Sequence, residues 1–114
     1  MMPNKIEPII NEFIQEISKV LKNSLKKAIL YGSYARGDYN ENSDIDIMIL
    51  TDLNDDEIEQ LKEKIVDIAF ELELKTGIVI SPIIRNIEKF EKRTNIIPFY
   101  MNVKREGVIL NGRL

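Results

Sequence analysis

The stretch Leu30–Leu50, LYGSYARGDYNENSDIDIMIL, predicts two buried strands joined by a glycine turn, a short helix and a polar loop. The first strand, Lys26–Tyr31, ends at Gly32 and Ser33, and the residues that follow suit a short helix that ends at Gly37. We therefore expect Ser33 at or beside a helix N-terminus, where backbone N–H groups and the positive end of the helix dipole can bind a phosphate. The Ser33 hydroxyl would be a further donor to that anion.

The second strand begins with two carboxylates, Asp44 and Asp46, in the run DIDIMIL. Positions i and i+2 of a strand point the same way, so both carboxylates should face one side about 6.6 Å apart, with Ile45, Ile47 and Ile49 in the core. Two like charges held together repel, and a pair of oxygen ligands at this spacing suits bound Mg2+. An outward-facing acidic stripe on a strand is the competing interpretation.

Together the two signals resemble a known family. Gly32-Ser33-x-x-Arg36-Gly37, followed by Ser43-Asp44-x-Asp46 on a strand, is similar to the signature of the polymerase-beta-like nucleotidyltransferase superfamily. In so short a chain it resembles the minimal nucleotidyltransferase branch, and the likeness in element order extends over nearly the whole sequence. The resemblance implies an α/β fold in which helices flank a small mixed β-sheet, the polymerase-beta-like nucleotidyltransferase core.

The resemblance also implies an activity and a set of site residues. It implies a Mg2+-dependent transfer of a nucleoside monophosphate, with ATP as the expected donor of AMP. Ser33, Asp44 and Asp46 are the expected catalytic residues, of which Asp44 and Asp46 would hold Mg2+. Gly32, Ser33 and Arg36 are expected to bind the nucleotide. Arg36 could equally be a structural ion-pair partner of a nearby carboxylate, and both roles stay open.

One strand departs from the family pattern. Relatives that transfer nucleotides generally carry a third acidic residue on a later strand, on the same face as the first two. The corresponding run here, Ile78–Ile84, holds no carboxylate, and Ser81 is its only residue with a polar side chain. A neutral hydroxyl is a poor Mg2+ ligand and is no base at neutral pH. The resemblance therefore supports the fold more strongly than the activity.

A second polypeptide supplies the acceptor in the minimal branch. It is typically a small helical HEPN-type toxin encoded alongside, and known members add AMP to one of its tyrosines. The resemblance thus implies an enzyme that acts as an antitoxin, and it leaves a hetero-oligomer open. The alternative is an antitoxin that keeps the fold and neutralises its partner by binding alone.

Composition limits the other possibilities. We expect one domain spanning residues 1–114, because 44% hydrophobic residues in 114 suffice for a single core. Lys+Arg 16 against Asp+Glu 19, with no basic run longer than two, predicts no direct nucleic-acid binding. With neither histidine nor cysteine, acid–base or metal chemistry must rest on carboxylates. No segment suggests a signal peptide or a membrane span, so we expect a cytoplasmic protein.

The remaining sequence predicts cover for the sheet. An apolar stripe from Ile6 to Leu25 predicts an amphipathic helix packed on the protein's own sheet, with a partner-binding helix as the alternative. Asn54 and Glu57 have capping-box spacing and should begin a long helix that Gly77 ends. The acidic residues of its first turn, Asp55–Glu57, suit the helix dipole better than a metal.

The C-terminal part predicts shorter elements. We expect a third strand at Ile78–Ile84, where Pro82 indicates a sheet edge or a bulge, and a short helix capped by Asn86. A helix over Pro98–Glu106 and a last strand over Val108–Leu110 follow.

Overall fold

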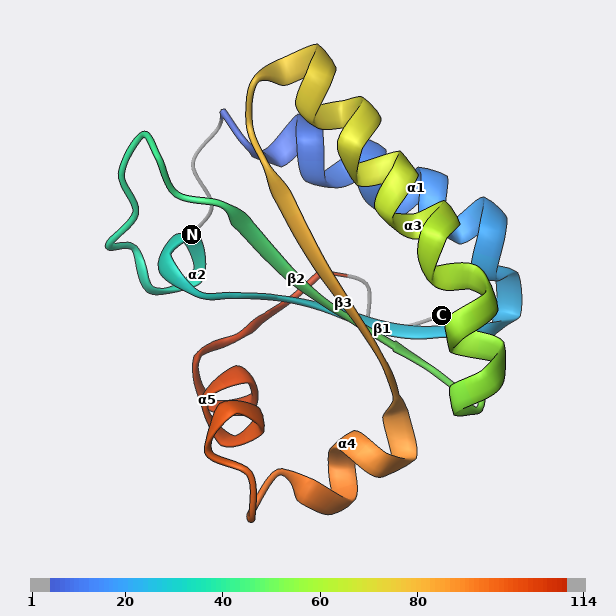
Figure 1. Ribbon diagram of the computed structural model, residues 1–114. Coiled ribbons are helices and arrows are strands. Elements are labelled where there is room, and N and C mark those ends of the chain that lie inside the picture. The colour runs from blue at the N-terminus through green and yellow to red at the C-terminus, as the bar shows by residue number, and fades with distance from the viewer. Residues whose placement is uncertain (1–4, 111–114) are drawn as a thin grey trace.

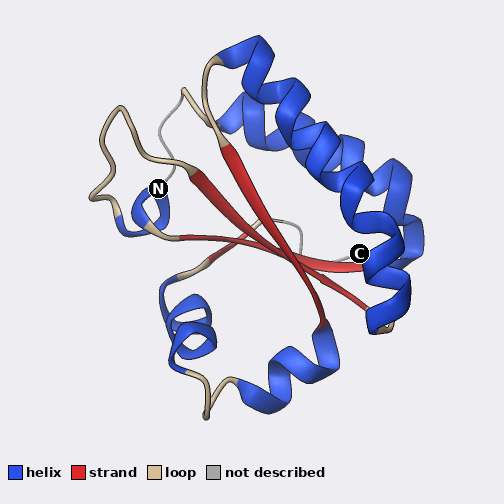
Figure 2. Ribbon diagram, in the orientation of Figure 1, coloured by secondary structure: helices blue, strands red, loops and turns tan. Residues whose placement is uncertain are grey.

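The computed structural model describes residues 5–110, and within them four strands form one mixed sheet in the order β3-β2-β1-β4. Strand β1 (Leu25–Tyr31) pairs antiparallel with β2 (Ile45–Thr51) and with β4 (Val108–Ile109). Strand β3 (Ile80–Asn86) runs parallel to β2. Helices lie on both sides of this sheet, as Figures 1 and 2 show. The predicted α/β architecture with a small mixed sheet is confirmed.

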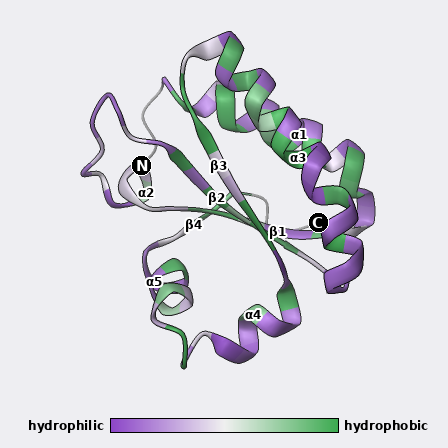
Figure 3. Ribbon diagram, in the orientation of Figure 1, coloured by the Kyte–Doolittle hydropathy of each residue, from purple (hydrophilic) through white to green (hydrophobic). Residues whose placement is uncertain are grey.

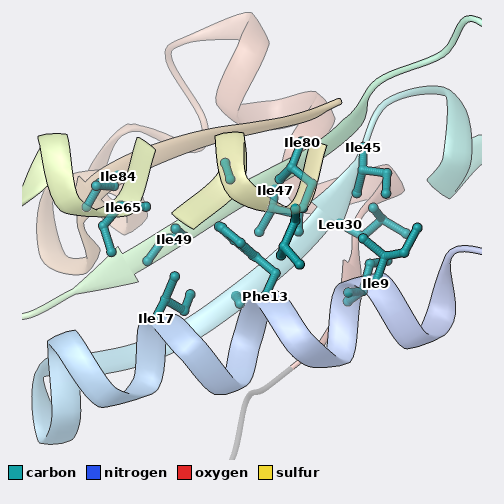
Figure 4. Packing of buried hydrophobic residues seen from close by; sticks show 14 of the residues in the cluster. Ile9, Phe13, Ile17, Leu30, Ile45, Ile47, Ile49, Ile65, Ile80 and Ile84 are labelled. Atoms are coloured by element: carbon teal, nitrogen blue, oxygen red, sulfur yellow. The ribbon is translucent and has the colours of Figure 1, made fainter. Parts of the chain in front are cut away.

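Helices α1 (Glu7–Leu21) and α3 (Asp55–Thr76) lie side by side over one face of the sheet (Figure 1). Figure 4 shows Phe13 and Ile17 of α1 pointing toward the isoleucines of the strands. Phe13 has no exposed surface, and the same is true of three residues of β2, namely Ile45, Ile47 and Ile49. Burial of an aromatic or branched aliphatic side chain is worth about 1.5–3 kcal/mol. This face therefore carries the main core, and the predicted inward side of β2 is confirmed.

Helices α4 (Ile87–Arg93) and α5 (Pro98–Glu106) cover the opposite face. A smaller cluster of buried residues lies beneath them, made up of Ile29, Met48, Leu50, Phe90 and Val103. Strand β2 is thus buried on both faces beyond its first residues. Figure 3 shows the same pattern, since the hydrophobic colour follows the strands while the loop between α2 (Ser33–Arg36) and β2 is hydrophilic.

Helix α1 is shorter than its apolar stripe predicts. The helix ends at Leu21, Lys22 adopts φ 53°, and the 3-10 turn η1 (Lys22–Ser24) leads into the sheet. Leu25, which the stripe placed in the helix, is the first residue of β1 and is fully buried. Its apolar character reflects the strand, so this part of the prediction is wrong.

Helix α3 begins and ends as predicted. The Asn54 side chain accepts from the Glu57 N–H at 2.9 Å, and the Glu57 carboxylate accepts from the Asn54 N–H at 3.0 Å. Gly77 ends the helix in the left-handed conformation, with φ 79°. Asp55 lies 2.7 Å from the Lys89 amine, and that hydrogen bond lowers the pKa of Asp55. The acidic first turn therefore has a structural role here.

Strand β3 begins and ends later than the predicted Ile78–Ile84. Its ladder with β2 starts where Ile80 lies beside Ile45, because Ile78 and Val79 are needed to lead the chain from Gly77 back to the sheet. The strand then continues past Ile84 through Arg85 and Asn86. The Asn86 side chain caps α4, because it accepts from the Lys89 N–H at 3.0 Å. As expected from Pro82, β3 is an edge strand.

Strand β4 ends at Ile109 rather than Leu110, although the Leu110 N–H still donates to the Ala28 carbonyl at 2.7 Å. None of the helices within residues 5–110 is long and apolar enough to cross a membrane.

Candidate functional site

The Gly32-Ser33 turn joins β1 to the short helix α2. Gly32 has φ 78° and ψ −156°, a conformation that side-chain-bearing residues rarely adopt, and a Cβ on Gly32 would collide with the Asp46 carboxylate. The Gly32 carbonyl accepts from the Arg36 N–H at 3.0 Å, and the Ser33 carbonyl accepts from the Gly37 N–H at 2.9 Å. Ser33 is therefore the first residue of α2, as predicted, and the turn lies directly against Asp46.

The loop that leads to the carboxylates is shaped by its own polar side chains. The Ser43 hydroxyl accepts from the Asn40 N–H at 2.9 Å, and the Asn40 side chain accepts from the Asn42 N–H at 2.8 Å. The Tyr39 ring stacks on the buried Tyr34 of α2, with centroids 4.7 Å apart. These contacts return the chain to the sheet at Asp44.

Asp44 and Asp46 lie together at the start of β2. Asp46 pairs in register with Tyr31 on one side and with Ser81 on the other, while Asp44 is exposed just before the strand. Partial burial, followed by the negative charge of Asp44, raises the pKa of Asp46, whereas Arg36 opposes that rise. The two carboxylates thus act on each other electrostatically.

Ser81 completes this group. Its hydroxyl donates to Asp44 Oδ2 at 3.2 Å, and its backbone lies beside Asp46 in the parallel ladder. The structure therefore places Ser81 next to both carboxylates. Among residues 5–110, no three acidic side chains come close enough together to hold a metal ion.

Arg36 forms ion pairs with two carboxylates. Its Nε donates to Asp38 Oδ2 at 3.2 Å, and a terminal guanidinium nitrogen lies 3.7 Å from Glu106 Oε2. The hydrogen bond to Asp38, with the charge of that residue, raises the pKa of Arg36. The ion-pair role left open by the sequence is thus present, and a phosphate contact by the same guanidinium remains a prediction.

The turn and Asp46 line a cleft of about 490 Å³. One wall consists of Tyr31, Gly32, Ser33, Arg36 and Asp46. The other belongs to α5 and consists of Phe99, Asn102, Val103 and Glu106. Sequence reasoning missed the α5 wall, because no local motif marks these residues and tertiary contacts, among them Phe99 with Tyr31 and β4 with β1, bring α5 back to the turn.

Tyr31 links the two walls. Its ring meets Phe99 edge to face, with centroids 5.5 Å apart and planes at 79°. Burial, and then the Asp46 charge, raises the pKa of Tyr31 to about 12, so its hydroxyl stays protonated at neutral pH.

The donor groups of the cleft fit a metal-bound phosphate ester. Asp46 in the cleft and Asp44 two residues before it offer hard oxygen ligands of the kind that Mg2+ prefers, and the glycine turn leaves room that a Cβ would fill. The Ser33 hydroxyl, the first N–H groups of the α2 turn and the Arg36 guanidinium are donors suited to phosphate oxygens.

Comparison with known proteins agrees with this arrangement. The model of the "Nucleotidyltransferase domain" family matches residues 10–105. Two proteins of Methanocaldococcus jannaschii, both named "Putative protein adenylyltransferase", are similar to this chain. One is 41% identical over 91% of this chain and 96% of its own length, and the other is 51% identical over 91% and 97%.

Two solved structures share the fold. One is described as a toxin-antitoxin with AMP-PNP, and it aligns with a TM-score of 0.54 and 19% identity over 96% of this chain and 74% of its own. The other, an MntA-HpeT toxin-antitoxin mutant, aligns with a TM-score of 0.53 and 18% identity over 89% and 72%. The family model and the sequence relatives each cover most of the chain, and so this protein belongs to the nucleotidyltransferase domain family and is a transferase.

Proposed function

We propose that this protein transfers AMP from Mg2+-bound ATP to a hydroxyl group of a partner protein. The observation that carries the proposal is the position of Asp46, with Asp44 two residues before it, directly against the Gly32-Ser33 turn within a nucleotidyltransferase fold. This arrangement puts oxygen ligands for a divalent ion beside donors for phosphate. The relatives named as protein adenylyltransferases support a protein as the acceptor.

Each residue of the turn and strand has a role in the proposed reaction. The Ser33 hydroxyl and the turn N–H groups hold the phosphates, and Gly32 allows the backbone to approach them. Asp44 and Asp46 hold Mg2+, which, when bound, would neutralise phosphate charge and make the α-phosphorus more electrophilic. Arg36 can exchange its contact with Glu106 for one with a phosphate oxygen, because an exposed ion pair at 3.7 Å contributes little free energy.

The step itself is a substitution at phosphorus. The acceptor oxygen bonds to the α-phosphorus, the bond from that phosphorus to the bridging oxygen breaks, and pyrophosphate leaves. The acceptor proton passes to a base that the partner or the solvent supplies. Positioning and charge neutralisation provide nearly all of the catalysis.

The partner is, in this proposal, a small helical HEPN-type toxin, with this chain as its single-domain antitoxin. The two structural neighbours described as toxin-antitoxin complexes support a toxin partner, and one of them contains the ATP analogue AMP-PNP. We place the reaction, and any hetero-oligomer with the toxin, in the cytoplasm.

A binding-only antitoxin is the second candidate, and one contact favours it. The Ser81 hydroxyl donates to Asp44 and lies beside Asp46, at the position where family resemblance leads us to expect a third carboxylate. A site with two carboxylates and a hydroxyl would be slower or inactive, while the fold could still occupy the partner's surface.

Intact-mass spectrometry of the partner separates the two candidates. The protein encoded next to this chain is co-expressed with wild type, with Asp44→Asn, or with Asp52→Asn as a control directly after the far end of β2. We expect the mass of one or more AMP groups with wild type and Asp52→Asn, and none with Asp44→Asn. A partner that is neutralised yet unmodified in all three samples would overturn the enzymatic proposal. Modification that persists in Asp44→Asn would contradict the site.

A further inference from the structure

The α5 wall of the cleft has no role in the reaction described above. Resting on the proposed function, we propose that this wall binds the nucleoside part of the donor, with the Phe99 ring stacked on the base and the Asn102 amide hydrogen-bonded to it. The proposal assigns two residues to the donor that no motif in the sequence marks.

Phe99 has the properties of a stacking platform. Its side chain lines the cleft and is 39% exposed, although exposed phenyl rings are unfavourable in water. Its orientation is fixed by Tyr31, which it meets edge to face, and by Tyr100, whose ring centroid lies 5.8 Å away. A ring that is fixed before binding loses little entropy when a base stacks on it.

Asn102 lies one helical turn beyond Phe99, on the same side of α5. Its side-chain oxygen accepts from the Arg105 guanidinium at 2.8 Å, which orients the amide. The amide nitrogen therefore keeps its two hydrogens for an acceptor in the cleft, such as a ring nitrogen of the base.

The charges of the cleft set the direction of the nucleotide. The phosphate donors and Arg36 belong to the wall of the glycine turn, whereas Glu106 is the only charged residue that α5 contributes to the lining. The glycine-turn wall offers phosphate donors and, in Asp46, an oxygen ligand for the Mg2+ of the triphosphate, whereas α5 contributes no cation to the lining. The uncharged nucleoside is the part of ATP that can lie against Phe99 and Asn102.

The test compares ATP with a ligand that has the phosphates alone. Calorimetry without any partner protein measures the binding of Mg-ATP and of magnesium tripolyphosphate to wild type, Phe99→Ala and Met101→Ala. Met101 is the matched control, because it is an apolar residue of the same helix with 40% exposure and does not line the cleft. Stacking of about 1–3 kcal/mol per base predicts at least a roughly fivefold loss of ATP affinity in Phe99→Ala.

The expected pattern is specific to the nucleoside. Phe99→Ala should leave tripolyphosphate affinity unchanged, Met101→Ala should change neither ligand, and Phe99→Trp should retain ATP affinity. Asn102→Ala should weaken ATP binding by a smaller factor, about threefold to tenfold for one hydrogen bond.

Three outcomes would overturn the inference. Unchanged ATP affinity in Phe99→Ala would do so, and a simultaneous loss of transfer would assign Phe99 to the acceptor instead. Equal losses for ATP and tripolyphosphate would show a general disturbance of the cleft. If wild type binds tripolyphosphate as tightly as ATP, the nucleoside does not contribute to binding. That result would contradict the nucleoside site and would still support the phosphate site. If wild type binds neither ligand, the phosphate site of the proposed function fails, and this inference fails with it.

Discussion

The two faces of the sheet carry hydrophobic clusters of different size. Under α1 and α3, fully buried isoleucines and leucines of the central strands meet Phe13, Ile17 and Ile65 of the helices (Figure 4). On the side of α4 and α5 the buried hydrophobic cluster is smaller, with three strand residues that meet Phe90 and Val103 of the helices, and the cleft opens beside it. The comparison indicates that the face under α1 and α3 contributes most of the stability of the fold. The face under α4 and α5 can therefore carry exposed and charged groups.

The sharpest test of this difference is a matched pair of truncations. Phe13→Ala should cost about 3–5 kcal/mol in the free energy of unfolding, because it leaves a cavity under two long helices. Phe90→Ala removes an equally large side chain from the smaller cluster and should cost less, about 3 kcal/mol, at the lower end for such truncations. Urea denaturation measures both. Equal losses would show that the two faces contribute alike.

A glycine pair tests how closely α5 must lie to the sheet. A Cβ on Gly107 would collide with the Ile29 side chain and the Val103 carbonyl, so Gly107→Ala should cost about 1–3 kcal/mol and displace α5. ATP affinity should fall with it. Gly77→Ala is the control, since its Cβ would meet open space and its cost of about 1 kcal/mol comes from φ 79° alone. If ATP binding survives in Gly107→Ala, the α5 wall is not needed for it.

Substitution of the carboxylate pair should change ligand binding and not stability, the opposite of what we expect for the core. Asp44→Asn combined with Asp46→Asn should abolish Mg-ATP binding while leaving the fold as stable or slightly more stable, because it removes a repulsion between like charges. Calorimetry with Mg-ATP and urea denaturation check the two halves of this prediction. Wild-type Mg-ATP binding by the double variant would refute the metal-site assignment.

The smallest expected effect is a pH dependence from Asp46. Its folded-state pKa lies above the ordinary value of 3.8, so between the two values the folded protein binds more protons than the unfolded chain. Its contribution to stability is therefore largest at low pH and decreases as the pH rises through that interval. Asp46→Asn should remove this component from unfolding curves measured across the acidic range, and Asp52→Asn should not. An unchanged slope in Asp46→Asn would show that the carboxylate titrates alike in both states.

Local signals determined which parts could be predicted from the sequence. Asn54 with Glu57, Gly77 and Asn86 each act through neighbouring backbone groups, and the structure confirms all three. The prediction that placed Leu25 in the first helix is wrong, because an apolar residue at helical spacing is equally suited to the start of a strand. The ends of β3 depend on its ladder with β2, which its own sequence does not encode.

The residues of the candidate site also fall into those that local sequence predicts and those that only the tertiary structure brings in. Gly32, Ser33, Asp44 and Asp46 are close in sequence, and the structure brings the turn against Asp46. Phe99 and Glu106 reach the cleft through tertiary contacts, Phe99 with Tyr31 and Glu106 with Arg36. Their contribution could not be read from residue type or spacing.

The short strand β4 has a consequence for the order in which the protein assembles during synthesis. Its pairings, Ile29 with Ile109 and Leu30 with Val108, join the earliest strand to the last described one. A nascent chain can form the glycine turn, both aspartates and the parallel ladder while α5 is still inside the ribosome. The second wall of the cleft is added only when α5 has been synthesised and packs on the sheet. Ribosomal products that stop before α5 would thus carry the complete Gly32–Asp46 motif and still lack half of the cleft.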